Sequence, residues 1–313
     1  MPLITVFTPT YNRAGKLHRV FNSLSNQSFK DFEWVIVDDG SQDETKNVVN
    51  QFIQQAPEFK IHYFFQTNAG KHIAINQGLM LAKGEWFHIA DSDDEIEPQT
   101  LSVFMDTWNG IPDNRKNEFC GIVACCKDQF GNRISDIVPG GIFDGHIKPL
   151  FYKYKFRKEF FHIYKTAVMR QFPFPDYIFN TYIPESVIWR RMTEKLKVRV
   201  ISNELRIYYI NEEQEGLMNR KGKSPQSRAL ANCIESANVL NYDLSYFIYY
   251  TLYFLKMAML YYSFKPFLDK QQAQWIRLRP KAKIFACMFF FAGKIYNIIL
   301  KRNYQKQLRK YDT

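Results

Sequence analysis

Residues 86–95 read Trp-Phe-His-Ile-Ala-Asp-Ser-Asp-Asp-Glu, an apolar run with strand character that ends in an acidic cluster. The cluster holds three carboxylates within four residues: Asp91, Asp93 and Asp94. Carboxylates this close repel one another, so the folded protein must offset the repulsion. A divalent cation such as Mg²⁺ or Mn²⁺ does so, because it prefers oxygen ligands and is commonly shared between carboxylates and a substrate phosphate. The alternative is an acidic turn before a helix that starts at Pro98.

Composition narrows the class of protein around this cluster. The 313 residues exceed one typical domain, which predicts one large domain or a catalytic core with an appendage. The net charge of +11 suits nucleic acid, an anionic membrane or phosphate-bearing substrates. The basic residues are dispersed without a nucleic-acid recognition motif, so we expect no nucleic-acid partner. Neither G-x-G-x-x-G nor G-x-x-x-x-G-K-[ST] follows a strand, which argues against dehydrogenases and P-loop enzymes.

The cysteines and the start of the chain suggest a cytoplasmic protein. The five cysteines are odd in number and form no C-x-x-C pair, so we expect a reducing compartment without disulfides. Cys125 and Cys126 lie in an apolar run that predicts a buried strand. Residues 1–7 read as a strand rather than a signal peptide. No apolar run reaches the roughly 18 residues that a membrane span needs.

The first hundred residues alternate strands and helices. Strands are predicted at 2–8, 32–37, 61–65 and 86–90. The first helix carries Leu17, Val20, Phe21 and Leu24 at helical spacing. A second helix is predicted to start with a capping box of Ser41 and Glu44, and a helix opening at Pro98 carries Leu101, Phe104, Met105 and Trp108 on one face. Near-continuously apolar strands in repeated βα units predict a parallel sheet covered on both faces, with polar loops at one edge.

The pattern changes after residue 118. From 119 to about 209 the predicted strands are shorter, including 198–201 and 205–210, and a helix opens at Pro184 and Glu185. Residues 211–228 read as a loop or linker. From 229 onward the pattern is helical and rich in Tyr, Phe and Lys.

Four loops together resemble a known family. They read Thr8-Pro9-Thr10-Tyr11-Asn12-Arg13; Val37-Asp38-Asp39-Gly40-Ser41; Asn68-x-Gly70 with Ala74, Asn76 and Gly78 downstream; and Asp91-Ser92-Asp93-Asp94. In order and spacing the chain resembles the GT-A nucleotide-sugar-dependent glycosyltransferases of family 2, which make bacterial surface polysaccharides. The match covers roughly residues 3–95 and extends more loosely to about 210. One such motif is weak, but four in register are specific.

The resemblance implies a fold and an activity. The fold is α/β of the GT-A type: a Rossmann-like, mostly parallel central sheet with flanking helices, plus a C-terminal helical extension. Residues 1–115 would be the nucleotide-sugar-binding half, 116–228 the acceptor-binding half and 229–313 the extension. The activity would be inverting, metal-dependent transfer from a nucleotide sugar, most simply UDP-linked, to a saccharide or lipid-linked acceptor in polysaccharide or capsule synthesis. The alternative is a catalytically degenerate nucleotide-binding or scaffold protein of the same fold.

The resemblance also assigns residues. Those for the nucleotide sugar are Thr8, Pro9, Tyr11, Arg13, Asp39, Lys71, Asp91 and Ser92. Asp39 would accept a hydrogen bond from the uracil N–H, Tyr11 would stack on the base, and Lys71 would reach the base or a phosphate. Asp91 and Asp93 look like the "DxD" pair, with Asp93 holding Mn²⁺ or Mg²⁺, which stabilises a leaving diphosphate. How the duties divide among these two and Asp94 stays open.

Inversion needs a carboxylate that takes the proton of the acceptor hydroxyl. Glu185 best matches the family's acidic position. Many relatives have a second acid next to it, which often serves as the base, and this chain has Ser186 there instead. Asp176 and Glu159 are the alternatives.

Several polar residues have a structural alternative to a functional role. Asp38 either caps its loop or contacts a ligand, and Asn76 either holds a loop or contacts the donor. For Arg13 and Lys71, the alternative to a functional role is a solvated charge on the protein surface. His88 and His162 are predicted as core histidines. Asn211 or Glu212 would be a weak replacement for a histidine that binds metal in some relatives.

The tail combines aromatic, aliphatic and basic residues. Segments 246–260 and 284–300 are densely apolar with Lys and Arg at their edges, which favours contact with an anionic bilayer at the inner face of the cytoplasmic membrane. The alternative is packing on the catalytic core or on a second copy of the chain as a homodimer. The two are compatible, and a lipid-linked acceptor would make membrane contact useful.

Overall fold

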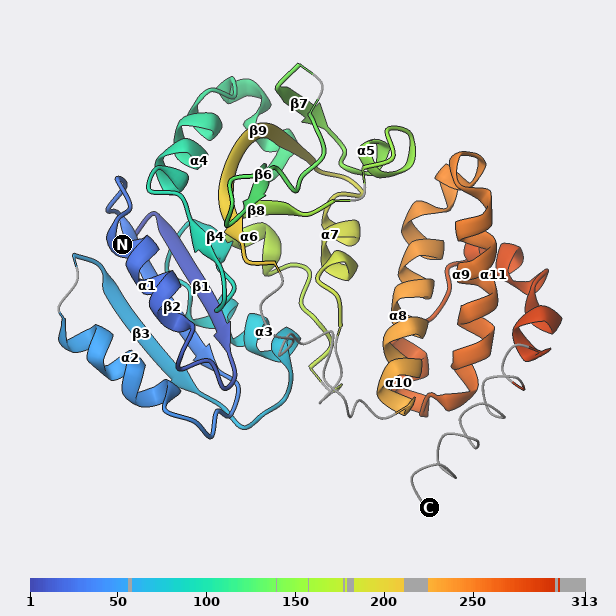
Figure 1. Ribbon diagram of the computed structural model, residues 1–313. Coiled ribbons are helices and arrows are strands. Elements are labelled where there is room, and N and C mark those ends of the chain that lie inside the picture. The colour runs from blue at the N-terminus through green and yellow to red at the C-terminus, as the bar shows by residue number, and fades with distance from the viewer. Residues whose placement is uncertain are drawn as a thin grey trace. The chain divides into compact units, whose positions relative to one another are not determined.

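The computed structural model describes residues 1–55, 58–138, 140–156, 158–176, 178, 183–210, 225–295 and 298 (Figure 1). The chain forms two compact units. The first comprises Met1–Phe179 and Met192–Asn219, and the second comprises Asn180–Arg191 and Arg220–Thr313. Asn211 and Glu212, and most of the predicted linker 211–228, lie outside the described residues.

The first unit is built on one sheet with the strand order β3-β2-β1-β4-β8-β6-β9-β5, in which β7 also pairs with β9. The strands are β1 (Ile4–Thr10), β2 (Phe32–Asp38), β3 (Lys60–Phe65), β4 (Trp86–Ile89), β5 (Glu95–Ile96), β6 (Phe119–Asp128), β7 (Ile142–Gly145), β8 (Phe160–Lys165) and β9 (Lys197–Tyr208). Strands β1 to β4 run parallel, and β8 lies antiparallel between β4 and β6. The predicted parallel first half and mixed second half are confirmed.

Helices cover both faces of the parallel strands. The helices of this unit are α1 (Leu17–Ser25), α2 (Thr45–Gln54), α3 (Lys71–Leu81), α4 (Thr100–Asn109), η1 (Asp113–Glu118), α5 (Lys148–Tyr152) and α6 (Thr166–Met169). Alternate strand residues such as Ile4 and Trp34 share one core with α1, α2 and α4. Phe7 points the other way, toward Gly78 of α3. The four apolar positions predicted for α1, and the four for α4, are all buried.

Several predicted boundaries and one predicted cap differ from the structure, and β1 lies two residues later than predicted. One continuous strand, β9, replaces the two strands predicted at 198–201 and 205–210. Ser41 does not cap α2, which starts at Thr45 with Glu44 as its N-cap and no side-chain cap. The Ser41 hydroxyl instead accepts a hydrogen bond from the backbone N–H of Asn12 at 2.8 Å, which ties two loops together. Helix α4 starts at Thr100, two residues after Pro98.

The second unit is helical, as predicted for the tail. It contains α7 (Ser186–Met192), α8 (Pro225–Asp243), η2 (Leu244–Tyr249), α9 (Thr251–Phe264), η3 (Lys265–Phe267), α10 (Lys270–Trp275) and α11 (Pro280–Cys287). Segment 180–191, which carries most of α7, belongs with these helices although it lies far from them in sequence. None of the helices in the described part of the chain has the length and apolar character needed to cross a bilayer.

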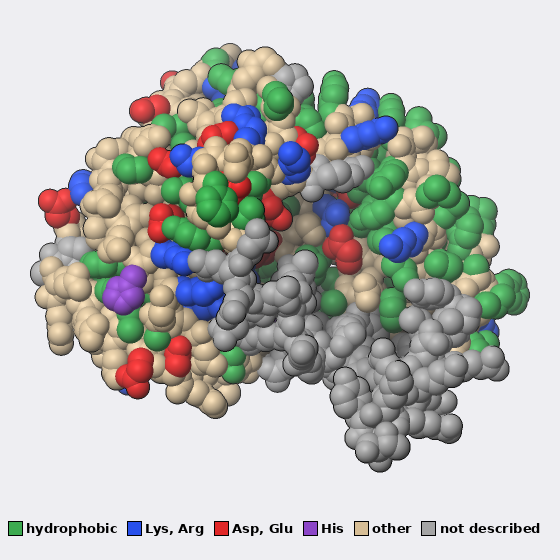
Figure 2. Space-filling view, viewed as in Figure 1, with side chains coloured by type: hydrophobic (Ala, Val, Ile, Leu, Met, Phe, Trp, Pro, Cys, Tyr) green, Lys and Arg blue, Asp and Glu red, His purple; other side chains and the backbone are tan. Residues whose placement is uncertain are grey.

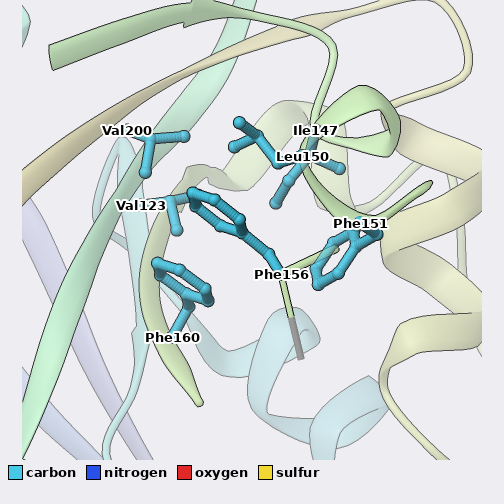
Figure 3. A pocket seen from close by; sticks show the side chains of 7 residues that line it. All are labelled: Val123, Ile147, Leu150, Phe151, Phe156, Phe160 and Val200. Carbon is cyan, nitrogen blue, oxygen red and sulfur yellow. The ribbon is translucent and has the colours of Figure 1, made fainter. Parts of the chain in front are cut away.

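A pocket in the second half of the sheet is apolar throughout. Figure 3 shows its lining side chains, which are Val123, Ile147, Leu150, Phe151, Phe156, Phe160 and Val200. The rings of Phe156 and Phe160 stack with centroids 5.7 Å apart. No lining side chain can bind a phosphate or a metal ion, so we assign the pocket to the core.

Cys125 and Cys126 are buried, as predicted, and all five cysteine thiols are free.

His88 is a core histidine, as predicted. It is fully buried on β4, and its ring meets Phe161 edge to face at 4.4 Å. The ring Nδ1 lies 2.8 Å from the carbonyl oxygen of His162. Burial lowers the pKa of His88 to about 4, although the hydrogen bond to this carbonyl acts in the opposite direction. The ring is therefore neutral at physiological pH.

We expect the free energy of unfolding to fall as the pH drops from about 6.5 to about 4. In this window the unfolded chain protonates His88 while the folded protein does not, so acid favours unfolding. Replacing His88 with Met should flatten the slope by up to about 1.4 kcal/mol per pH unit. Urea unfolding across this window measures the slope, with exposed His18→Met as the control. An unchanged slope in His88→Met would contradict the assignment.

Candidate active site

The sheet order creates a switch point beside β1. Strand β1 pairs with β2 on one side and with β4 on the other, so the loops that follow β1 and β4 diverge. Ligands bind at such points in open α/β sheets, beyond the carboxyl ends of the strands. All four loops that carried the resemblance lie at this edge, and contacts between side chains and backbone join each loop to the next.

The loop after β1 reaches the loop after β2. Asn12 adopts a left-handed backbone conformation with φ of 51°, and its side-chain oxygen accepts a hydrogen bond from the backbone N–H of Gln42 at 2.8 Å. Thr8 and Pro9 are buried within β1, and the Thr8 hydroxyl accepts a hydrogen bond from the Trp34 indole. Thr8 is therefore part of the buried strand that carries the loop, whereas Tyr11 lies in the loop itself and is half-buried.

Asp39 joins the loop after β2 to the loop after β3. One carboxylate oxygen accepts hydrogen bonds from the Ala69 N–H and the Gln66 amide, and the other accepts from the Gly70 N–H, each at 2.8 Å. The approach of the two loops requires glycine at position 40, because a Cβ there would lie 2.8 Å from the Asn68 nitrogen and φ is +86°.

Asp38 and Asn76 have the structural roles that were one of their two predicted readings. The Asp38 carboxylate accepts hydrogen bonds from the Ser41 N–H at 2.8 Å and the Tyr63 hydroxyl at 2.7 Å. The Asn76 amide exchanges two hydrogen bonds with the backbone of Phe174. Both residues fix loops around the site.

Three cations surround the acidic cluster after β4. The Lys71 ammonium lies 2.6 Å from one Asp91 oxygen, and the Arg13 guanidinium lies 3.4 Å from Asp93 across the switch point. Arg206 pairs with both Asp91 and Asp94. Arg13 is 8% exposed and the Lys71 side chain 18%, so neither is a solvated surface charge. The predicted repulsion among the carboxylates is therefore offset by side chains.

The contribution of Arg206 was missed in the sequence. It comes from β9, more than a hundred residues after the cluster, and this strand also carries Lys197, Arg199 and Glu204, so its charge does not set Arg206 apart in the sequence. Burial alone would raise the pKa of Asp91, but Lys71 and Arg206 lower it to about 2. Burial raises the pKa of Asp94, with Arg206 acting in the opposite direction. Arg206 thus favours the ionised form of both Asp91 and Asp94.

A second missed residue is Arg19 on α1. Its guanidinium donates a hydrogen bond to the backbone oxygen of Asp93 at 3.2 Å and lies 3.8 Å from the centre of the Tyr209 ring. The Tyr209 hydroxyl donates to Glu95 at 2.7 Å. Glu97 pairs with Lys127 at 2.6 Å. The two glutamates that follow the cluster therefore tie β5 and its flanks to the second half of the sheet.

The carboxylates differ in their availability to a metal ion. Within the described residues, no group of three or more His, Cys, Asp and Glu side chains is placed to hold an ion alone. Asp91 and Asp94 are engaged by Lys71 and Arg206, while the Asp93 side chain is 36% exposed. One accessible carboxylate fits a Mg²⁺ or Mn²⁺ ion that takes its other ligands from a phosphate and water.

Glu185 and Ser186 lie in the helical unit. The Glu185 carbonyl accepts the first hydrogen bonds of α7, from the N–H groups of Ile188 and Trp189. The Ser186 hydroxyl accepts a hydrogen bond from Arg190 at 3.1 Å, and Arg190 also pairs with Glu235 at 2.8 Å and with Asp243. Ser186 thus belongs to a network that joins α7 to α8. The alternatives Asp176 and Glu159 are exposed in the first unit.

Comparison with known proteins identifies the family. The model described as "Glycosyl transferase family 2" matches residues 5–178, more than half of the chain. The GalNAc(5)-diNAcBac-PP-undecaprenol beta-1,3-glucosyltransferase of Campylobacter jejuni is 31% identical over 67% of this chain and 65% of its own length. An uncharacterized glycosyltransferase of Nostoc is 40% identical over 34% of this chain and 32% of its own length. The chain thus spans less than two thirds of these relatives.

Solved structures agree on the fold. S. aureus TarS 1-349 in complex with UDP-GlcNAc has a TM-score of 0.56 at 20% identity, covering 94% of this chain and 81% of its own. A mannosyltransferase from Pyrobaculum calidifontis, in complex with GDP-Man and Mn2+, has a TM-score of 0.52 at 16% identity, covering 95% and 87%. The fold is of the GT-A type, as predicted. The chain belongs to glycosyl transferase family 2.

Replacing Arg206 with Met should destabilise the first unit by about 3–5 kcal/mol, because Asp94 would remain buried without its cation. The double variant Arg206→Met with Asp94→Asn removes the stranded charge and should recover at least half of the loss. Urea unfolding of four proteins, namely the unchanged protein, Arg206→Met, Asp94→Asn and the double variant, measures the coupling. Additive losses in the double variant would show that the pair is not coupled.

Proposed function

We propose that the protein is an inverting, metal-dependent glycosyltransferase. It would move a sugar from a nucleotide sugar, most simply a UDP-sugar, to a saccharide or lipid-linked saccharide in bacterial polysaccharide synthesis, at the inner face of the cytoplasmic membrane. The observation that carries this proposal is the meeting of Lys71, Arg13 and Arg206 with the acidic cluster at the switch point. A site that holds cationic side chains beside carboxylates can bind a diphosphate and a metal ion together.

The nucleotide would bind over the joined loops. A carboxylate has about four acceptor positions, and the Ala69, Gly70 and Gln66 donors occupy three at Asp39. The fourth suits the uracil N–H, while Tyr11 offers a ring for stacking. The TarS structures in complex with UDP and UDP-GlcNAc support a UDP donor, and the GDP-Man complex of the mannosyltransferase keeps GDP among the nucleotides to test.

Lys71 and Arg13 would change partners when the donor binds. Each now pairs with a carboxylate, and each can turn to a phosphate oxygen, because a phosphate competes directly for a charged donor. Asp93 would hold the Mn²⁺ or Mg²⁺ ion, with Asp91 on the ribose side beside buried Ser92. When bound, the ion would act as a Lewis acid that stabilises the leaving diphosphate. The mannosyltransferase complex with Mn2+ supports a metal in this fold.

The acceptor and the base are proposed from the relatives. The C. jejuni relative is named for an undecaprenol-linked saccharide, which supports a lipid-linked acceptor. Glu185 is the proposed base, since it matches the family's acidic position. The catalytically degenerate alternative depended on Ser186, and the Arg190 network gives that serine a structural reason.

Replacing Asp93 with Asn should lower metal-dependent release of nucleotide from a UDP-sugar by about a hundredfold or more, because the ion loses its protein ligand. The assay compares UDP-, GDP- and dTDP-sugars with Mn²⁺, with Mg²⁺ and with EDTA. Asp113→Asn is the control, because this carboxylate is 93% exposed on η1. Full metal-dependent activity in Asp93→Asn would disprove the metal role.

Replacing Glu185 with Gln should leave donor binding intact and lower sugar transfer by about 10²–10⁴-fold, because the amide cannot accept the hydroxyl proton. Calorimetric titration with UDP and Mn²⁺ measures binding, and product formation with an acceptor measures transfer. The variants Glu159→Gln and Asp176→Asn serve as comparisons. Normal transfer in Glu185→Gln, with loss in either of the others, would move the base there.

A further inference from the structure

The last described helices expose an unusual row of large apolar side chains. Ile284, Met288, Phe291, Ile295 and Ile298 are 72%, 67%, 75%, 61% and 53% exposed. They follow one another at alternating steps of four and three residues, from α11 through a turn at 288–289 into the helical residues after it. This spacing places large side chains on the same side of successive helical turns. We call these five residues the α11 stripe. Figure 2 shows many hydrophobic side chains on the surface of the helical unit.

The orientation of the stripe is fixed by the opposite face, which carries small residues. Ala282 and Ala286 are buried there. Gly293 follows on the same face, where a Cβ would lie only 2.7 Å from the Cβ of Tyr262 on α9. Its carbonyl accepts a hydrogen bond from the Ser263 hydroxyl at 2.9 Å. Close packing on α9 therefore uses the small residues and leaves the large ones facing outward.

The charges beside the stripe are all positive. Lys281 lies on one side, and Lys283 and Lys294 on the other, when residues are placed at about 100° steps around a helix. All three lysines are exposed. Residues 280–298 contain no acidic residue. A second copy seated on the stripe would bring these lysines together without carboxylates to pair with them, whereas an anionic lipid surface complements them.

A second exposed group continues this surface. The ring of Phe247 in η2 meets that of Phe285 in α11 with centroids 5.1 Å apart. Next to Phe247, Ile248 and Leu252 are 76% and 79% exposed, and Tyr249 and Tyr250 are exposed between them. Tyrosine suits the boundary between headgroups and acyl chains, because its ring is apolar and its hydroxyl polar.

We propose that the α11 stripe docks on an anionic lipid bilayer, with α11 lying in the plane of the interface. The apolar side chains would enter the acyl boundary, and the flanking lysines would contact anionic headgroups. This contact names the surface that would hold the enzyme at the membrane; its observations do not depend on the transfer reaction, but its use rests on the proposed function. Its use would be to hold the enzyme at the surface where a lipid-linked acceptor is found.

Sedimentation of the full chain with vesicles tests the proposal. We expect binding to vesicles of phosphatidylcholine with phosphatidylglycerol, weaker binding to phosphatidylcholine alone, and a decrease as salt is added. Replacing Phe291 and Ile295 with Asn should weaken binding to the anionic vesicles by about tenfold or more. The matched control replaces Met80 and Phe130 with Asn, because these are 77% and 71% exposed in the first unit.

Three results would overturn the proposal: no binding of the unchanged protein to anionic vesicles, equal loss in the control, or full binding in the stripe variant. Sedimentation velocity on the same proteins detects a second copy as the occupant, since the stripe variant would then convert a dimer to a monomer. Nucleotide release measured without vesicles separates a failure of docking from a failure of the proposed transfer.

Discussion

The active-site edge of this protein depends on the neutralisation of buried carboxylates. Asp94 is nearly inaccessible to solvent, and Asp91 lies against it, so the pair is tolerated only because Arg206 and Lys71 approach from two other elements. The ion pair thereby joins β9 to the loop after β4. The same cations are the groups that we propose bind a diphosphate. One electrostatic constraint thus serves both folding and the proposed binding.

The first half of the fold could be predicted because its signals are local. Strands β1 and β2 are short apolar runs, helices α1 and α4 show their buried faces at helical spacing, and each loop carries its own motif. Parallel βα units then determine at which edge the motifs meet. The residues at that edge, Asp39, Lys71 and Asp91 among them, were therefore found together without knowledge of any contact.

The contacts that could not be predicted depend on pairings between segments that are distant in sequence. Arg206 was invisible as a site residue, because nothing near it in sequence indicates that β9 runs beside the acidic cluster. The Ser41 hydroxyl was assigned to a cap, although the backbone of Asn12 competes for it. Segment 180–191 joined the helical unit through Arg190, Glu235 and Asp243, which are spread over more than fifty residues. Periodicity carries no information on such partners.

Arg206 and Asp94 come from different halves of the domain, which limits the choice of parent chains for a chimera. The two residues are 112 positions apart, so they enter any gene fusion from opposite sides of a crossover placed between β4 and β9. A chimera that takes its first half from this chain inherits the carboxylates, but its counter-charge comes from the other parent. We therefore expect such a chimera to keep the counter-charge of Asp94 only when the second parent carries a cation at the position of Arg206.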